Sequence, residues 1–231
     1  MKWAYEAQPD VVTHLLDTAL SDGDHPWHHA TIVTINKPGK PDYSVPKAHR
    51  PISLLECMGK VLEKIVANRF QRDIEAYQLL SNSQFGSRPQ HCTVDAGAVL
   101  IHCVQAAHTA GHTAALLMFN ISGFFDNIDP NRAIQVLKLK GFPTHVQQWT
   151  HAFLTKCTAS LQYRMRLSER FEITHGMPQG SPLSPILSAL YTSPLLDITD
   201  TWSHKDLNLY VDDSAILAIS ATANAAALSA H

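Results

Sequence analysis

Apolar side chains recur at intervals of three and four along residues 55–77, which is the spacing of one face of an α-helix. Basic side chains occupy the opposite face, so this segment is predicted to be a long amphipathic helix. Shorter helices are predicted over 8–20 and 93–109, each followed within a few residues by a glycine that can end a helix. The apolar positions of the long helix are Met58, Val61, Leu62, Ile65, Val66, Phe70, Ile74 and Tyr77, and the basic ones are Lys60, Lys64, Arg69 and Arg72.

Other segments have the pattern of strands or of proline-led helices. Two helices are predicted to begin at Pro130 and Pro143, and a third over 183–202 with a break at Pro194. Helices and strands are mixed without an internal repeat, so we expect an α+β protein. The predicted strands are 30–35, 114–121, a hairpin over 159–175 that turns through Leu167–Arg170, and the pair 207–212 and 213–219, which meet at an acidic turn.

Composition sets limits on the class of protein. The chain has 231 residues, 45% of them hydrophobic and 16% charged, so it can bury a core in one domain or two small ones. No apolar run approaches the roughly 18 residues that cross a membrane, and the first residues lack the apolar stretch of a secretory signal. We therefore expect an intracellular protein, cytoplasmic or nuclear, with no membrane partner. The cysteines form no Cys-x-x-Cys pair, so we expect reduced thiols at Cys57, Cys92, Cys103 and Cys157.

The net charge of −2 conceals an uneven distribution. Residues 37–72 hold eight Lys or Arg against three Asp or Glu, and residues 132–170 hold seven against one. Acidic residues gather near the start of the chain and after residue 170. Basic surfaces around an acidic centre would be able to bind a polyanion next to bound metal cations. Solvated helix faces are the alternative explanation.

Tyr210-Val211-Asp212-Asp213 places two adjacent carboxylates at the tip of a predicted hairpin. A tight turn normally favours Asp followed by Gly or Asn, because neighbouring carboxylates repel each other and positive φ angles are costly for Asp. A divalent cation such as Mg²⁺ would relieve the repulsion, since it takes oxygen ligands. The pair therefore indicates a metal site, with an ordinary exposed turn as the alternative.

Residues 176–185, Gly-Met-Pro-Gln-Gly-Ser-Pro-Leu-Ser-Pro, form a second unusual segment at the start of a predicted helix. Its two glycines allow the backbone to approach a ligand closely, and its three prolines restrict the path of the chain. Gln179 offers both a hydrogen-bond donor and an acceptor. A capped helix start would account for Ser181 and Pro182, but not for the amide of Gln179 between two glycines.

Three segments in this order, Asn120–Asp126, Gly176–Pro185 and Tyr210–Asp213, resemble motifs A, B and C of reverse transcriptases. Lys37–Pro41, His49–Leu55 and Gln84–Pro89 resemble finger motifs of the non-LTR (LINE-like) retrotransposon branch, and the match covers about residues 30–220. The resemblance implies a right-hand polymerase fold with fingers and a palm whose antiparallel sheet is packed by helices. It implies fingers with the N-terminal helix at 1–112, palm with motif A at 113–129, fingers at 130–176, and palm with motifs B and C at 177–231.

The resemblance also implies a chemistry and a set of partners. The expected reaction is DNA synthesis from deoxynucleoside triphosphates on a DNA primer paired with an RNA template. Two Mg²⁺ ions would be held by the carboxylates of Asp212 and Asp213, and placing them is most of the catalysis in phosphoryl transfer. Gln179 would contact the sugar and base of the nucleotide, and Phe125 would be the steric gate against a 2′-hydroxyl.

Three further residues are implied as substrate contacts. Gly180 and Tyr210 belong to motifs B and C and are assigned with them. Arg50 is a candidate contact to the triphosphate, a role that Lys37 or Lys40 could share. An ordinary surface salt bridge is the alternative role of Arg50.

One position departs from the family pattern. Motif A should begin with an aspartate that contacts both metal ions, and this chain has Asn120. An amide oxygen can coordinate Mg²⁺, but it is neutral, so the ions lose one compensating charge. Asp126 and Asp129 lie beyond the following turn and are not expected to replace it. A catalytically defective domain is therefore predicted, and because the sequence continues only about eighteen residues past Asp213, a truncated domain without a thumb is expected.

Two alternatives remain at this point. One is a non-catalytic remnant of a retrotransposon, or a decayed copy, that still binds nucleic acid. The other is an unrelated metalloprotein that uses the fourteen histidines. Two sets of histidines invite a metal site, but neither set has zinc-finger spacing. The segments concerned are His25, His28 and His29, then His91-Cys92 and His102-Cys103.

Overall fold

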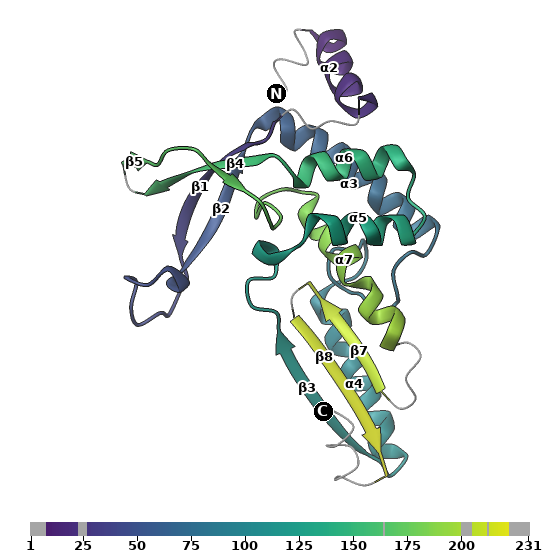
Figure 1. Cartoon of the computed structure of the whole chain (residues 1–231). Helices are drawn as coiled ribbons and strands as arrows, with labels where there is room; N and C mark the ends of the chain where they lie inside the picture. The colour runs from purple at the N-terminus through teal and green to yellow at the C-terminus, as the bar shows by residue number, and fades with distance from the viewer. Residues whose placement is uncertain (1–7, 23–26, 164, 200–204, 212, 222–231) are drawn as a thin grey trace. The chain divides into compact units, whose positions relative to one another are not determined.

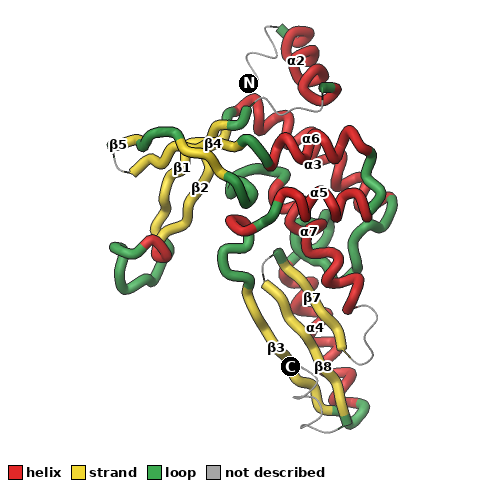
Figure 2. Tube along the Cα trace, in the orientation of Figure 1, coloured by secondary structure: helices red, strands yellow, loops and turns green. Residues whose placement is uncertain are grey.

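The computed structural model describes residues 8–22, 27–163, 165–199, 205–211 and 213–221. The chain forms two compact units, which are described separately below. The first unit contains Met1–Asn68 and Phe125–Ser184, and the second contains Arg69–Phe124 and Pro185–His231. Figure 1 labels the helices and strands, and Figure 2 colours them by type. Both units contain helices and strands, which confirms the α+β prediction.

The first unit contains a mixed sheet with the strand order β2-β1-β4-β5, and β6 also pairs with β4. β1 pairs with β2 antiparallel and with β4 parallel. The strand β2 is an edge strand, so it can include a proline. The strands are β1 (His29–Asn36), β2 (His49–Leu55), β4 (Cys157–Tyr163), β5 (Arg166–Leu167) and β6 (Phe171–Ile173).

Helices α5 (Pro130–Leu139) and α6 (Thr144–Leu154) pack against each other in the first unit. The side chain of Asp129 caps α5, because its Oδ1 accepts a hydrogen bond from the backbone N–H of Asn131 at 2.9 Å. In α6 the buried rings of Trp149 and Phe153 are stacked, with centroids 5.8 Å apart. The unit also contains α2 (Pro9–Ser21) and the short 3₁₀ helices η1 (Pro46–Ala48) and η2 (Phe125–Asn127).

The second unit contains an antiparallel three-stranded sheet in the order β3-β8-β7. Helix α4 packs against this sheet and runs along it (Figure 1). Leu209 of β7 is buried with Leu196, and Ile216 of β8 packs against them. The bounds are β3 (Thr113–Asn120), β7 (Lys205–Tyr210), β8 (Asp213–Ser220) and α4 (Thr93–Thr109).

Two longer helices have residues in both units, α3 (Cys57–Ala76) and α7 (Ser184–Thr199). The apolar face predicted for α3 is buried at Leu62, Val66, Phe70 and Ile74. Within the described ranges, no helix is both long enough and apolar enough to cross a membrane.

The structure corrects four local predictions. Helix α7 continues through Pro194 without the predicted break. The predicted turn at Leu167–Arg170 is misplaced, because Leu167 lies in β5 and pairs with Gln162. Pro143 is the N-cap of α6 and not its first residue. Strand β2 was not predicted, because its sequence begins with histidine, arginine and proline, which are weak strand formers.

Candidate active site

Asn120 and Asp213 lie opposite each other on neighbouring strands of the second unit. Asn120 ends β3, Asp213 begins β8, and the antiparallel register pairs the two residues. Asn120 Nδ2 donates a hydrogen bond to Asp213 Oδ1 at 3.3 Å, and both residues are exposed. The pairing of β7 with β8 places Tyr210 opposite Asp213 on its other side. These three predicted residues therefore meet at one end of the sheet.

The turn between β7 and β8 is held in a strained conformation. Val211 has a φ of +60°, which costs a β-branched residue about 1–3 kcal/mol. Gly86 lies against this turn, since a Cβ at that position would be 2.6 Å from the backbone nitrogen of Val211. Backbone hydrogen bonds also join Leu209 to the segment just before Gly86. Asp212, the other predicted carboxylate, lies outside the described residues.

The loop that contains Gln179 is attached to the η2 turn in the first unit. The backbone N–H of Met177 donates to the carbonyl of Phe125 at 2.7 Å, and that of Gly176 donates to the carbonyl of Ile128 at 2.8 Å. Gly176 has a φ of +93°, and a Cβ there would lie 2.8 Å from the Phe125 oxygen. Glycine is therefore required for this close backbone approach.

The same loop is attached to strand β2 on its other side. The backbone N–H of Ser53 donates to the carbonyl of Gln179 at 2.8 Å. Gly180 follows with a φ of +137°, and a Cβ there would lie 2.6 Å from the Ser53 oxygen. Because backbone N–H groups two residues apart in a strand point the same way, the nitrogen of Pro51 also faces away from β1. This explains how the sheet accepts a proline in β2.

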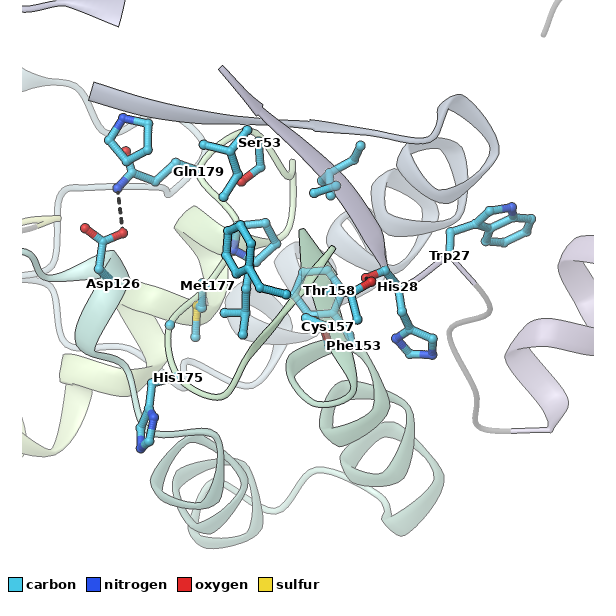
Figure 3. A pocket seen from close by; sticks show the side chains of 18 of the residues that line it. Trp27, His28, Ser53, Asp126, Phe153, Cys157, Thr158, His175, Met177 and Gln179 are labelled. Atoms are coloured by element: carbon cyan, nitrogen blue, oxygen red, sulfur yellow. Dashed lines mark hydrogen bonds between the residues drawn. The ribbon is translucent and has the colours of Figure 1, made fainter. Parts of the chain in front are cut away.

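The side chain of Gln179 points toward Asp126 of η2 (Figure 3). Gln179 Nε2 donates a hydrogen bond to Asp126 Oδ1 at 3.1 Å. Phe125, the predicted steric gate, lies next to Asp126 in η2 and is partly buried. Asp126 was considered from the sequence only as a substitute for the missing aspartate, and its contact with Gln179 was not predicted.

Below this loop, the buried carboxylate of Glu63 on α3 contacts Ser181. Glu63 is 1% exposed, and its Oε2 accepts a hydrogen bond from Ser181 Oγ at 2.5 Å. Ser181 Oγ in turn accepts from the backbone N–H of Leu183 at 3.0 Å. Burial raises the pKa of the Cys157 thiol to about 11, and the nearby Glu63 contributes to the shift in the same direction. The burial of Glu63 was not predicted from the sequence, because its neighbours Lys60 and Lys64 in the helix are basic residues assigned to the polar face.

A cavity of about 220 Å³ lies beside the loop in the first unit (Figure 3). Apolar side chains from the sheet and from α6 form most of its wall. Met177, Pro178 and Gln179 line it from the loop, so it adjoins the residues predicted to contact a nucleotide. Examples of the apolar lining are Ile32, Leu55, Phe153, Phe171 and Ile173.

Comparison with known proteins decides the family. The family described as reverse transcriptase (RNA-dependent DNA polymerase) matches residues 35–230. The chain belongs to the reverse transcriptase family. Several of its curated relatives are named as RNA-directed DNA polymerases of Drosophila mobile elements, which supports the LINE-like branch of this family.

Three of these relatives come from Drosophila melanogaster. The probable RNA-directed DNA polymerase from transposon BS is 32% identical over 207 residues, which are 87% of this chain and 22% of the relative. The corresponding protein from transposon X-element is 28% identical over 192 residues, with 82% and 21% covered. The polymerase from mobile element jockey is 27% identical over 210 residues, with 88% and 23% covered. The chain thus spans about a fifth of the length of these relatives.

Solved telomerase structures have the same fold as this reverse transcriptase domain. Telomerase from Candida tropicalis, in complex with a TWJ fragment of telomeric RNA, superposes with a TM-score of 0.65 at 10% identity, covering 95% of this chain and 41% of that one. The apo telomerase truncated from its C-terminal domain gives 0.62 at 13% identity, covering 86% and 44%. At this identity the likeness shows the fold alone, which is the right-hand polymerase fold that the sequence predicted. The predicted boundaries of fingers and palm stay a prediction.

The remaining predicted residue, Arg50, lies on β2 of the first unit opposite Ile35 and is exposed. Among the residues that the structure describes, Arg50 has no ion-pair partner, which disfavours the salt-bridge alternative. The exposed side chains of Lys40 and Lys47 lie in the connection between β1 and β2.

The histidines do not form a metal site in the described ranges. No group of three His, Cys, Asp or Glu side chains there is arranged to hold a metal ion. His29 Nδ1 instead contacts Thr158 Oγ1 at 3.1 Å, and His91 Nδ1 contacts the carbonyl of Pro89 at 2.9 Å. Together with the family match, this argues against an unrelated His-rich metalloprotein.

Proposed function

We propose that this reverse transcriptase domain is built for RNA-templated DNA synthesis and performs it poorly, because an amide occupies the first position of motif A. The observation that supports this proposal is the pairing of Asn120 with Asp213 across β3 and β8. A carboxylate at residue 120 would face the carboxylate of Asp213, and divalent cations would neutralise both. The Asn120 amide instead satisfies Asp213 through its own N–H.

The donor chemistry fits Mg²⁺ only in part. Asp213 and Asp212 would hold the ion, with Asn120 able to offer one neutral amide oxygen. When bound, the ions supply activation of the primer hydroxyl and neutralisation of the triphosphate. With one carboxylate fewer, the centre provides less negative charge to keep two dications close together. We therefore infer weaker metal binding and less stabilisation of the transition state.

Four of the proposed substrate contacts, Gln179, Gly180, Phe125 and Arg50, belong to the first unit. Gln179 would bind the sugar and base of the incoming deoxynucleoside triphosphate, and Phe125 would exclude a 2′-hydroxyl. Arg50 would bind the triphosphate as an exposed cation without an ion pair in the described ranges. An RNA template with a DNA primer is the partner that the names of the relatives support, since they are RNA-directed DNA polymerases. Gly180 would support the Gln179 contact through the backbone, and Tyr210 is assigned to the substrate as part of motif C.

Primer extension on an RNA template tests this proposal directly. The unaltered chain, Asn120→Asp and Asn120→Ala are compared with Mg²⁺ and with Mn²⁺. If the lost stabilisation is about 4 kcal/mol, Asn120→Asp extends the primer about a thousandfold faster than the unaltered chain. Asn120→Ala is the matched control, since it removes the amide without adding charge. Equal rates for the unaltered chain and Asn120→Asp would contradict the impairment, and no extension by a folded Asn120→Asp would contradict the polymerase function.

A second candidate function is binding of nucleic acid without catalysis. The exposed basic residues around the β1–β2 connection, Lys40, Lys47 and Arg50, support it. Binding of a primer–template should then weaken with salt, with a slope of log affinity against log salt of about −0.7 for each phosphate contacted on a single strand. Salt-dependent binding would favour this function over synthesis if neither the unaltered chain nor the Asn120→Asp variant extends the primer.

A further inference from the structure

Asp126 has no role in the proposed chemistry, yet its carboxylate contacts a residue that does. Asp126 Oδ1 accepts a hydrogen bond from Gln179 Nε2 at 3.1 Å (Figure 3). The two residues are far apart in sequence and meet because η2 and the 176–180 loop are joined in the first unit. The structure thus pairs an acidic side chain at the end of motif A with the only amide side chain in motif B.

The backbone of the loop is held without help from the Asp126 side chain. On one side, Met177 donates a backbone hydrogen bond of 2.7 Å to Phe125 of η2, and Gly176 donates one of 2.8 Å to Ile128, just after η2. On the other side, the carbonyl of Gln179 accepts from the N–H of Ser53 at 2.8 Å. Removal of the Asp126 carboxylate should therefore leave the position of the loop unchanged. The contact acts on the orientation of the Gln179 amide.

The chemistry of the two groups makes that orientation unique. An ionised carboxylate only accepts hydrogen bonds, whereas an amide has a donor on one side and an acceptor on the other. Turning the Gln179 amide by half a rotation would place its oxygen against Asp126 Oδ1. We propose that Asp126 is a positioning residue, which fixes the Gln179 amide so that its carbonyl oxygen and one N–H stay available to the incoming deoxynucleoside triphosphate. This inference rests on the nucleotide-binding role proposed above for Gln179.

A double-mutant comparison of nucleotide binding tests the proposal without requiring catalysis. The full chain is bound to an RNA template and a dideoxy-terminated primer, and the affinity for the next correct deoxynucleoside triphosphate is measured. Asp126→Ala should weaken binding about fivefold to tenfold, as expected for one partly exposed hydrogen bond to a charged group. The variant Asp126→Ala/Gln179→Ala should bind no more weakly than Gln179→Ala alone. Independent losses that multiply in the double variant would overturn the proposal.

Two further variants test whether Asp126 positions the Gln179 amide or acts only through the fold or through its negative charge. Asp126→Asn has the same shape but can donate as well as accept, so it should bind nucleotide more weakly than the unaltered chain although it folds alike. Glu172→Ala removes an exposed carboxylate from β6 of the same unit and should bind normally. A loss of binding in Glu172→Ala equal to that in Asp126→Ala would overturn the proposal, because a general loss of negative charge would then explain both.

The side-chain amide signals of Gln179 provide a readout that does not depend on nucleotide. In ¹⁵N spectra of the full chain, assigned by their loss in Gln179→Ala, these signals should move toward those of a solvent-exposed glutamine in Asp126→Ala and stay in place in Glu172→Ala. Unchanged signals in Asp126→Ala would overturn the proposal. If nucleotide binds to neither the unaltered chain nor Asn120→Asp, the proposed function fails, and the amide signals still decide whether Asp126 positions Gln179.

Discussion

Replacing Gly180 by alanine should destabilise the loop of the candidate nucleotide site, although it adds only one methyl group. The Gly180 φ of +137° is a conformation that side chains rarely adopt, which costs about 1–3 kcal/mol after substitution. The new Cβ would also lie 2.6 Å from the Ser53 carbonyl oxygen, a backbone atom that cannot rotate away. Moving the loop to relieve this contact would break the hydrogen bond from Ser53 to Gln179, worth about 1 kcal/mol. We therefore expect Gly180→Ala to lower the free energy of unfolding by about 3 kcal/mol.

Two other glycines are controls: Gly39 has a positive φ without the steric contact, and Gly97 has neither. Gly39 has a φ of +72° and nothing within 4 Å of a built Cβ, so Gly39→Ala should show the backbone cost alone, about 1 kcal/mol. Gly97 lies inside α4 with open space around its Cβ and no positive φ, so Gly97→Ala should stabilise by about 0.5–1 kcal/mol. The free energy of unfolding of all three variants is measured by urea denaturation, with circular dichroism as the signal. A cost for Gly180→Ala no larger than that for Gly39→Ala would refute the reasoning about the contact with Ser53.

The other predictions concern two ionisable groups. Because burial raises the pKa of Cys157 from 9.0 to about 11, its thiolate fraction at pH 8 is about a hundredfold below that of an ordinary thiol. Iodoacetamide should therefore alkylate Cys157 about a hundredfold more slowly in the folded chain than in the unfolded chain. The same shift contributes stability that is lost as the pH rises from about 9 to about 11, so Cys157→Ala should flatten the fall in unfolding free energy in that range. The guanidinium of Arg88 binds both oxygens of Glu75, at 3.0 and 2.9 Å, and lowers the pKa of that carboxyl. The contribution of this ion pair to the free energy of unfolding should be lost as the pH falls through the lowered pKa of Glu75. Arg88→Ala should remove this acid sensitivity. An unfolding free energy with the same pH dependence in Arg88→Ala and the unaltered chain would contradict the pairing.

Local sequence patterns were sufficient to predict most of the elements. The three-and-four spacing of apolar residues predicted α3 closely, since burial of one helix face depends on that spacing. The helix predicted over 93–109, before Gly111, has the same bounds as α4. The apolar run before Asn120 predicted β3, and the acidic turn after Tyr210 predicted the β7–β8 hairpin. Strand β2 could not be predicted in this way. It forms because β1 pairs with it on one side and the Gln179 carbonyl accepts the Ser53 N–H on the other.

The candidate site was predictable in its residue types and not in its contacts. Motif order alone predicted a role for Gln179 and Asp213, whose residue types match motifs B and C, and for Asn120 by its position at the start of motif A. The contacts of Gln179 with Asp126 and of Ser181 with Glu63 join residues separated by 53 and 118 positions. No local pattern connects such pairs, since their proximity depends on how the strands and helices of the first unit pack.

The sequence by itself determined the family, the strands β3, β7 and β8 around motifs A and C, and the substitution of an amide for the first acid of motif A. These follow from residue identity and short-range spacing, which the chain carries before it folds. Only the tertiary structure decided that the Asn120 amide donates to Asp213, that Gly180 has no room for a methyl group, and that Asp126 contacts Gln179. Hydrogen bonds and steric contacts act over a few ångströms, so they depend on distances that exist only once remote segments are packed together.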